Sequence, residues 1–340
     1  MKSLKTAVSQ TNNGKGCRQD MTDKMIIELD RAAEIISLSD DILILTHANP
    51  DGDTLGSAAA MCLALTQLGK RSRIENSDEI PHKYSYLFEK IENADFEPRF
   101  IMSVDVADKK LLGDLEEKYE GKIALSIDHH GSNRLFADET CVDAGSASTT
   151  ELILKLLKLL KVDITPEIAN AVYTGLATDT GCFRFMNTTA NTHAAAAEMM
   201  TAGADHVMIN KLMFETKSFS YMKLEKRGLE GLTMHFDGRV AVISLTGEDF
   251  RISGASQQDC DAICGIPRQI EGVDIGITMR EKAENLYKIS VRTNGDFNAS
   301  AVCQLLGGGG HKGAAGCEIR GTLEEAKKAI LGAVGEYIGA

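Results

Sequence analysis

DILILTHANPDGDTLGSAAAMCLALTQLG occupies residues 41–69 and decides the fold of the first half of the chain. The apolar run over 41–47 is typical of a buried strand that ends in polar residues. A polar loop begins at Ala48, and the small, apolar residues 56–69 predict a helix closed by Gly69. Strand, polar loop and helix in this order begin a βαβ unit, so the stretch predicts an α/β fold.

Two further apolar runs extend this pattern. FIMSVDV over residues 100–106 and KIALSIDHH over 122–130 also end in carboxylates or histidines. Helical patterns precede them at 25–36 and follow them at 148–161 and 166–178. We expect a mostly parallel sheet flanked by helices, in which ligand sites lie at the carboxyl ends of the strands.

The chain is long enough for two domains. A smaller α/β domain with a mixed sheet is predicted by strand-like runs over 239–246, 273–281 and 286–294 and by an amphipathic helix over 323–338. We expect the active site in a cleft between the domains. The expected division is a disordered leader over residues 1–22, a first domain over 23–202, a helical linker over 203–229 and a second domain over 230–340.

Composition narrows the functional classes. A formal net charge of -12 disfavours long duplex nucleic acid, whose binding relies on many cationic contacts. Small phosphorylated ligands stay compatible if cations converge in an acidic pocket. No apolar run is long enough for a membrane span and no export signal is visible, so we expect a cytoplasmic protein with reduced thiols.

The motif HANPDGD places His47, Asp51 and Asp53 just after the first predicted strand. One interpretation is that the acids only cap the following helix. The other is a metal site, because an imidazole and two carboxylates suit a divalent cation. More acids and histidines follow at or near the predicted ends of elements: Asp105, Asp108, Asp128, His129, His130 and Asp179.

Clustered carboxylates repel one another unless cations intervene. Two cations that share a bridging carboxylate would remove this repulsion and could neutralise charge on a phosphoryl oxygen. Ligation by His and Asp without cysteine favours Mn²⁺ or a similar ion over structural zinc.

A glycine run, GGGGHKGAAG, lies in the predicted second domain at residues 307–316. Its backbone N–H groups could approach a phosphate, whereas a glycine run taken alone favours a loop that needs positive φ angles. His311 and Arg292 shift the balance toward phosphate binding. Arg292 and Arg184 could each clamp an anionic oxygen, or each could form a surface ion pair.

Taken in order, HANPDGD, DVAD, DHH, TDTG and GGGGHKGAAG resemble the DHH phosphoesterase superfamily with its DHH-associated C-terminal domain. The resemblance implies that Asp105 bridges two cations and that His130 faces the scissile phosphate as a catalytic group. It also implies that Asp128 orients His129 or His130. It implies two metal-ligand sets: His47, Asp51 and Asp105 for one cation, and Asp53, Asp105, His129 and Asp179 for the other. It assigns substrate binding to His130, Arg184, Arg292, Asn298, Gly308, Gly309, Gly310 and His311.

Within the superfamily, the sequence is most similar to the bacterial oligoribonuclease and 3',5'-bisphosphate nucleotidase group. That likeness implies hydrolysis of short oligoribonucleotides to 5'-mononucleotides, removal of the 3'-phosphate of pAp, or both. Alternatives are a cyclic-di-AMP or pApA phosphodiesterase, a RecJ-like single-strand exonuclease, a family II pyrophosphatase and a non-catalytic nucleotide sensor. The glycine run argues against the pyrophosphatase, length and charge argue against the exonuclease, and a homodimer is left open.

Overall fold

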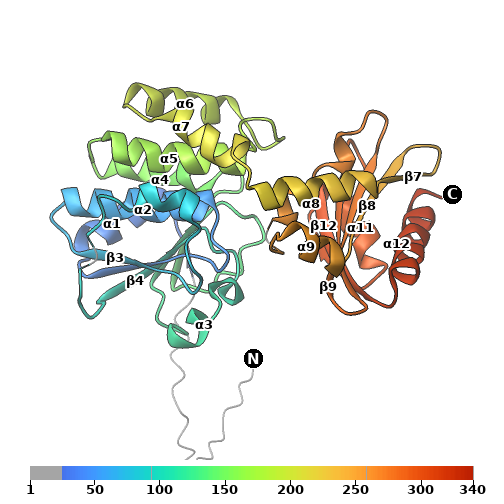
Figure 1. Ribbon diagram of the computed structural model, residues 1–340. Coiled ribbons are helices and arrows are strands. Elements are labelled where there is room, and N and C mark those ends of the chain that lie inside the picture. The colour runs from blue at the N-terminus through green and yellow to red at the C-terminus, as the bar shows by residue number, and fades with distance from the viewer. Residues whose placement is uncertain (1–24, 93, 258, 340) are drawn as a thin grey trace, which may run out of the picture. The chain divides into compact units, whose positions relative to one another are not determined.

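The computed structural model describes residues 25–92, 94–257 and 259–339, so the leader expected over 1–22 lies outside them. The chain forms two compact units that divide between Thr216 and Lys217 (Figure 1). The segment expected as a helical linker contributes to both units. Its helix α7 (His206–Asn210) packs on α5 (Pro166–Asp179) in the first unit, and α8 (Phe219–Glu230) packs on β8 (Val240–Leu245) in the second.

The first unit contains the expected parallel sheet. Its six strands run in the order β1-β6-β5-β4-β2-β3, and every neighbouring pair is parallel. The strands are β1 (Met25–Ile26), β2 (Ile42–Leu45), β3 (Ser72–Glu75), β4 (Phe100–Val104), β5 (Leu125–Asp128) and β6 (Glu139–Val142).

The prediction of a helix from residue 25 is wrong for its first residues. Met25 and Ile26 pair with β6 as an edge strand, because the Met25 N–H donates to the carbonyl of Asp138 and the Ile27 N–H donates to that of Thr140. Helix α1 then begins only at Leu29.

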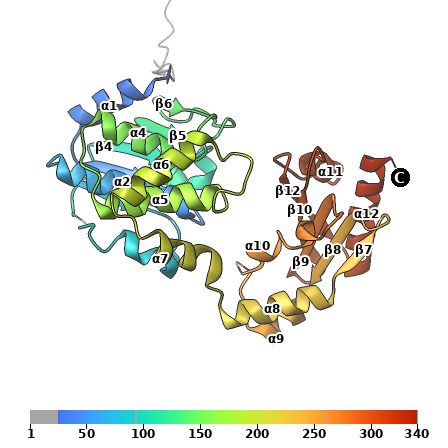
Figure 2. The ribbon, with the colours of Figure 1, turned by 90° about the horizontal axis from the view of Figure 1, so that it is seen from above.

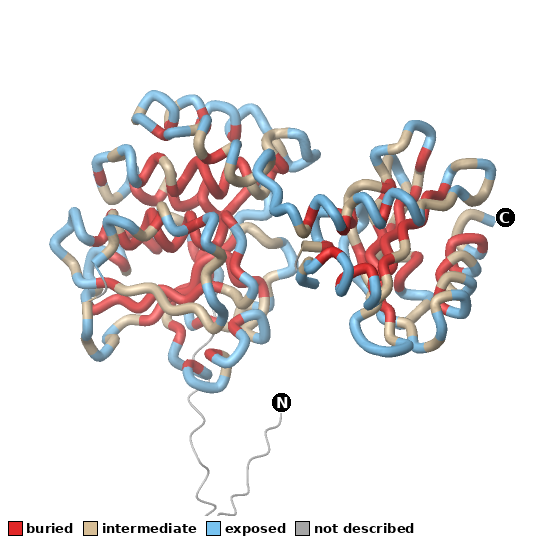
Figure 3. The backbone as a smooth tube through the Cα atoms, viewed as in Figure 1, coloured by how far each residue is buried: buried red, intermediate tan, exposed pale blue. Residues whose placement is uncertain are grey.

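Both faces of this sheet are covered, as expected for parallel strands. Ile42 and Ile44 of β2 face a core formed with α1 (Leu29–Leu38), α2 (Gly52–Gln67), α4 (Thr149–Leu159), α5 and α6 (Ala190–Thr201). Leu43 and Leu45 face a smaller core with α3 (Leu115–Lys118) and the short helix η2 (Lys109–Leu112). Figure 3 shows the buried backbone concentrated in the strands and in the helices packed on them.

Helix α2 begins earlier than predicted, at Gly52 instead of Gly56. The Asp51 side chain accepts hydrogen bonds from the N–H groups of Asp53 and Thr54, which caps the helix. This correction matters for the site, because it places Asp53 in the rigid first turn of a helix.

The second unit is built on the expected mixed sheet, ordered β11-β12-β10-β9-β8-β7. Strands β8 and β9 are parallel and the other pairs are antiparallel. Helices α11 and α12 cover one face, while α8, α9 and α10 cover the other (Figure 2). The bounds not yet given are β7 (Thr233–His235), β9 (Ile275–Ala283), β10 (Leu286–Thr293), β11 (Gly309–Gly310), β12 (Ala314–Arg320), α9 (Gly247–Ser253), α10 (Cys260–Ile263), α11 (Ala299–Gln304) and α12 (Leu323–Ile338).

Within the described ranges, no helix combines the length and the apolar character that a membrane crossing requires.

Candidate metal centre

The predicted ligands converge at the carboxyl edge of the parallel sheet. Three neighbouring strands, β2, β4 and β5, end beside one another at this edge, and helices α2 and α5 add side chains from their ends. Together these elements supply His47 after β2, Asp51 and Asp53 at the start of α2, Asp105 after β4, His129 and His130 after β5, and Asp179 as the last residue of α5.

Asp105 stands between two sets of candidate ligands. Its Oδ2 lies 3.7 Å from His47 Nε2, and that nitrogen lies 3.6 Å from Asp51 Oδ1. Its Oδ1 lies 3.8 Å from His129 Nε2, which lies 3.5 Å from Asp179 Oδ2. Each carboxylate oxygen of Asp105 therefore faces a different set, as a bridging ligand requires.

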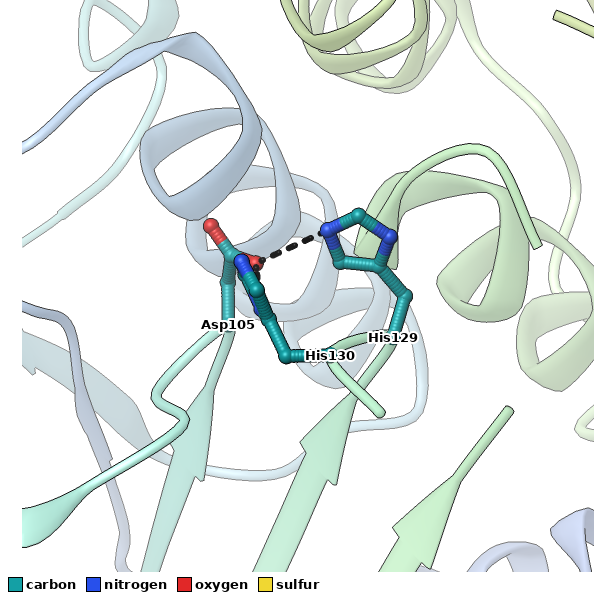
Figure 4. A group of neighbouring side chains, drawn as sticks. All are labelled: Asp105, His129 and His130. Carbon is teal, nitrogen blue, oxygen red and sulfur yellow. Dashed lines mark ion pairs between the residues drawn. The ribbon is translucent and has the colours of Figure 1, made fainter. Parts of the chain in front are cut away.

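The second set is completed by Asp53, whose Oδ2 lies 4.0 Å from His129 Nε2. His47, Asp51 and Asp105 each offer one ligand atom such that the three atoms lie within 4.8 Å of one another, and the same holds for Asp53, His129 and Asp179. Figure 4 shows Asp105 after β4 with His129 and His130 after β5, their side chains turned toward one another.

The local backbone fixes Asp105 in place. Its φ of 60° lies in the left-handed region, which is uncommon for a residue other than glycine and is often held in this state at functional sites. The hydroxyl of Thr149 donates to its Oδ1 at 2.9 Å, and Asp105 is only 3% exposed. The carboxylate is thus buried and held in one orientation by the protein itself.

Asp53 is held by the N-terminus of α4. The backbone N–H groups of Thr149 and Thr150 donate to its two carboxylate oxygens at 2.6 and 2.9 Å. A Cβ at Gly175 would lie 2.6 Å from Asp53 Oδ1, so glycine is needed where α5 passes. Neither threonine was predicted as a site residue, although the Ser148-to-Glu151 capping pattern predicts that a helix starts there.

Burial and mutual repulsion destabilise the ionised carboxylates of this cluster. Burial raises the pKa of Asp53 well above its usual value, and the charges of Asp105 and Asp179 add to the effect. Burial likewise raises the pKa of Asp179 to about 6. Burial alone would lower the pKa of His47, but the nearby carboxylates of Asp105 and Asp51 outweigh burial and raise it to about 11. Without cations, protons must neutralise the centre.

The donor atoms fit divalent cations. They are carboxylate oxygens and imidazole nitrogens, and His129 Nε2 is buried without a hydrogen-bond partner although it points at three carboxylates. Such an orphaned nitrogen is costly unless it binds something. Asp51 serves both interpretations of its motif, since it caps α2 and also belongs to one ligand set.

His130 is arranged differently from the ligands around it. Its Nδ1 lies 2.8 Å from Asp128 Oδ1, and the Asn133 amide donates to the other oxygen of Asp128. The hydrogen bond with Asp128 raises the pKa of His130 to about 9, so the ring is protonated at neutral pH. Burial favours the neutral form of Asp128, yet the bond to His130 outweighs it and lowers the carboxyl pKa.

The substrate-binding residues predicted in the second unit gather at one end of its sheet. Arg292 of β10 pairs with Ala314 of β12, the strand that also pairs with the Gly309–Gly310 strand. Several of the expected groups already have partners in the chain. The Gly308 N–H donates to the Cys303 carbonyl, Arg292 Nη1 donates to the Val291 carbonyl, and the Asn298 side chain caps α11. His311 is exposed. Arg184 belongs to the first unit, where its Nε donates to the Gly181 carbonyl at 2.6 Å.

Comparison with known families identifies the class that this fold and centre define. Residues 41–176 match the DHH family, N-terminal domain, and residues 238–340 match the DHHA1 domain. The chain therefore belongs to the DHH family, as its motifs predicted.

Curated relatives narrow this further. The bifunctional oligoribonuclease and PAP phosphatase NrnA of Thermus thermophilus is 33% identical over 317 residues, which cover 90% of this chain and 93% of the relative. The NrnA of Bacillus subtilis is 24% identical, with 84% of this chain and 91% of the relative covered. The cyclic-di-AMP phosphodiesterase PdeA of Listeria monocytogenes is also 24% identical, but only 49% of its length is covered.

Solved structures agree on the fold. The crystal structure of an exopolyphosphatase-related protein from Bacteroides fragilis has a TM-score of 0.84 and 27% identity, with 91% of this chain and 96% of that chain covered. RecJ from Thermus thermophilus, solved with Mn²⁺, has a TM-score of 0.52 at 14% identity, with 91% of this chain and 54% of RecJ covered. At that identity the likeness to RecJ concerns the fold alone.

Proposed function

We propose that this chain is a metal-dependent phosphoester hydrolase that cleaves short oligoribonucleotides to 5'-mononucleotides and removes the 3'-phosphate of pAp. The main support for the proposal is the position of Asp105. One of its carboxylate oxygens faces each of two sets of His and Asp ligands. The similarity to the NrnA relatives over nearly the whole length of both chains supports the choice of substrates.

Two sets of residues are proposed to hold the two cations needed for hydrolysis. His47, Asp51 and Asp105 would hold one cation, and Asp53, Asp105, His129 and Asp179 the other. When bound, the cations would supply Lewis-acid stabilisation of the charge that develops on a phosphoryl group. The carboxylates orient this centre through their own hydrogen bonds to Thr149 and Thr150.

His130 is the proposed catalytic contact with the phosphate. Because Asp128 occupies Nδ1, the ring has Nε2 left to donate to a phosphoryl oxygen. The protonated ring would stabilise negative charge there. Asp128 is then a positioning residue, which fixes the orientation of the ring and keeps it charged.

The second unit is proposed to bind another part of the substrate. Arg292 offers a guanidinium that matches phosphate oxygens, and the glycine run with His311 offers a surface with few side chains. Arg184 and Asn298 are kept as proposed contacts of the nucleotide. Mn²⁺ as the resident metal, a cytoplasmic location and a homodimer stay predictions.

A panel of substrates tests the proposal. Initial rates would be measured with pAp, pApA, a longer RNA, cyclic-di-AMP and pyrophosphate, each with Mn²⁺ and with a chelator. We expect turnover of pAp and pApA that the chelator abolishes, and much slower cleavage of the other compounds. Preference for pyrophosphate, or rates that do not respond to the chelator, would overturn the assignment.

A further inference from the structure

The turn after the edge strand β3 contacts the loop that carries His47. Strands β2 and β3 pair in parallel up to Leu45 and Glu75, and the Thr46 N–H still donates to the Glu75 carbonyl at 3.3 Å. Beyond this point the side chain of Asn76 continues the contact, because its Nδ2 donates to Thr46 Oγ1 and to the His47 carbonyl, both at 2.7 Å. A side chain thus connects the edge strand to the backbone of a candidate metal ligand.

The carboxamide of Asn76 uses all of its hydrogen-bonding groups in one direction. Nδ2 has two N–H groups for its two acceptors, and Oδ1 accepts from the Asp78 N–H at 2.7 Å. The reverse orientation of the amide would turn its donors toward that N–H. A carboxylate in this place would have no donor for the His47 carbonyl, so the position suits asparagine and not aspartate.

The peptide group between His47 and Ala48 is held from both sides. Its carbonyl, from His47, accepts from Asn76, and its N–H, from Ala48, donates to the Leu111 carbonyl at 2.6 Å. Leu111 belongs to η2, so two elements that are distant in the sequence fix one peptide plane. Only the bond from Asn76 comes from a side chain.

The next peptide group fixes the imidazole ring. The Asn49 N–H donates to Asp78 Oδ2 at 2.6 Å, and Asn49 has the uncommon positive φ of 51°. The carbonyl oxygen of this peptide group, from Ala48, lies 2.8 Å from His47 Nδ1. Because a carbonyl only accepts hydrogen bonds, Nδ1 donates to it and Nε2 is left for a cation.

We propose that Asn76 is a positioning residue for His47 and thereby sets the affinity of the chain for one of its two cations. This inference rests on the proposed function for the presence of two cations and adds a positioning residue to it. None of the hydrogen bonds of Asn76 described above involves the ligands that complete the other set, which are Asp53, His129 and Asp179. The other cation should therefore bind as before when Asn76 is lost.

Binding of Mn²⁺ to the metal-free protein tests this inference without any substrate. The electron paramagnetic resonance signal of free Mn²⁺ gives the number of bound ions and their dissociation constants. For the unmodified protein we expect two ions per chain. N76A should weaken one of them by roughly 10- to 100-fold, the usual loss when the partner of a metal ligand is removed, and leave the other unchanged. In a protein that already carries H47A, N76A should have no further effect.

Asn294 provides the matched control. It is half-buried like Asn76, and its Nδ2 also donates to two carbonyls, those of Arg268 and Val273, both at 2.8 Å, but in the second unit. N294A therefore removes the same kind of contact far from His47 in the sequence. It should leave both Mn²⁺ dissociation constants unchanged.

A milder variant covers the case in which N76A does not fold. Asp78 is exposed, so D78A should fold, and it removes the acceptor that holds the Asn49 N–H. We expect D78A to weaken the same ion as N76A, but by less. E79A removes the neighbouring exposed carboxylate and should not weaken either ion, which separates the lost hydrogen bond from the lost charge.

The outcomes separate this inference from the proposed function. Fewer than two ions on the unmodified protein, equal weakening of both ions by N76A, or a comparable loss in N294A overturns the inference. If pAp is hydrolysed but N76A and D78A bind both ions at full strength, the inference fails and the proposed function stands. If N76A weakens one ion alone while the unmodified protein hydrolyses neither pAp nor pApA, the positioning role stands and the proposed function fails.

Discussion

The two units place their candidate functional groups in opposite ways. In the first unit, charged side chains from distant parts of the sequence meet in a buried centre, where Asp53 and Asp105 are 1% and 3% exposed. In the second unit, the candidate groups are one arginine and a run of glycines at the end of a sheet, and His311 is exposed. The first arrangement depends on side-chain chemistry and the second on backbone shape, so the two should respond differently to substitution.

The largest expected effect is on the bridge of the metal centre. D105N removes the charge that faces both ligand sets, and we expect kcat to fall by about 10³-fold or more with the fold intact. Steady-state kinetics and circular dichroism would measure this. D108N is the matched control, since Asp108 belongs to none of the candidate ligand sets and caps η2. Near-normal turnover by D105N would refute the bridge.

In the second unit, the largest expected effect is a loss of folding stability when a side chain is added where the backbone is closely packed. A Cβ at Gly308 would lie 2.5 Å from Cys317 Cβ, whereas one at Gly309 would meet nothing within 4 Å. We expect G308A to lower the free energy of unfolding by about 3 kcal/mol, the upper end for overpacking, and G309A to change it far less. Chemical denaturation of both variants measures the difference. Equal losses would show that the glycine run is not closely packed at Gly308.

A smaller effect is expected when a positioning residue is changed. D128N should lower kcat by about 10- to 100-fold, because His130 loses the partner that orients it. The pH dependence of activity should also change. His130 stays protonated up to its pKa of about 9, and without Asp128 that pKa falls toward the usual value of about 6.5. The alkaline loss of activity should therefore begin at a lower pH in D128N than in the unmodified protein.

A double substitution serves as the control for this prediction. If Asp128 acts only through His130, D128N combined with H130Q should cost no more than H130Q alone. Additive losses, or an alkaline limb that does not move in D128N, would contradict the positioning role.

The smallest effect is expected at Arg292. R292K keeps the positive charge but loses the planar fork, so we expect KM for pAp to rise by about 10-fold with little change in kcat. R239K is the control, because Arg239 is paired with Asp274 in the same unit. A loss of kcat comparable to that of D105N would remove the contrast between the two units.

The sequence predicted the clustering of these acids and histidines more completely than the rest because parallel strands end at a common edge. His47, Asp105 and His129 each follow a strand of apolar residues, so their convergence could be inferred without coordinates. The support from Thr149 and Thr150 could not, since it depends on where the N-terminus of α4 meets α2. The same limit hid the edge strand at Met25, which exists only through its pairing with β6.

The double role of Asp51 Oδ1 bears on how the centre would bind cations. The oxygen that caps α2 by accepting two backbone N–H groups is also the oxygen nearest His47. A cation bound by this oxygen would share its ligand atom with the cap of α2, so its binding and the closing of the first turn of α2 would be thermodynamically linked. Hydrogen exchange at the amides of Asp53 and Thr54 would then serve as a local gauge of site occupancy, slowing as the centre loads.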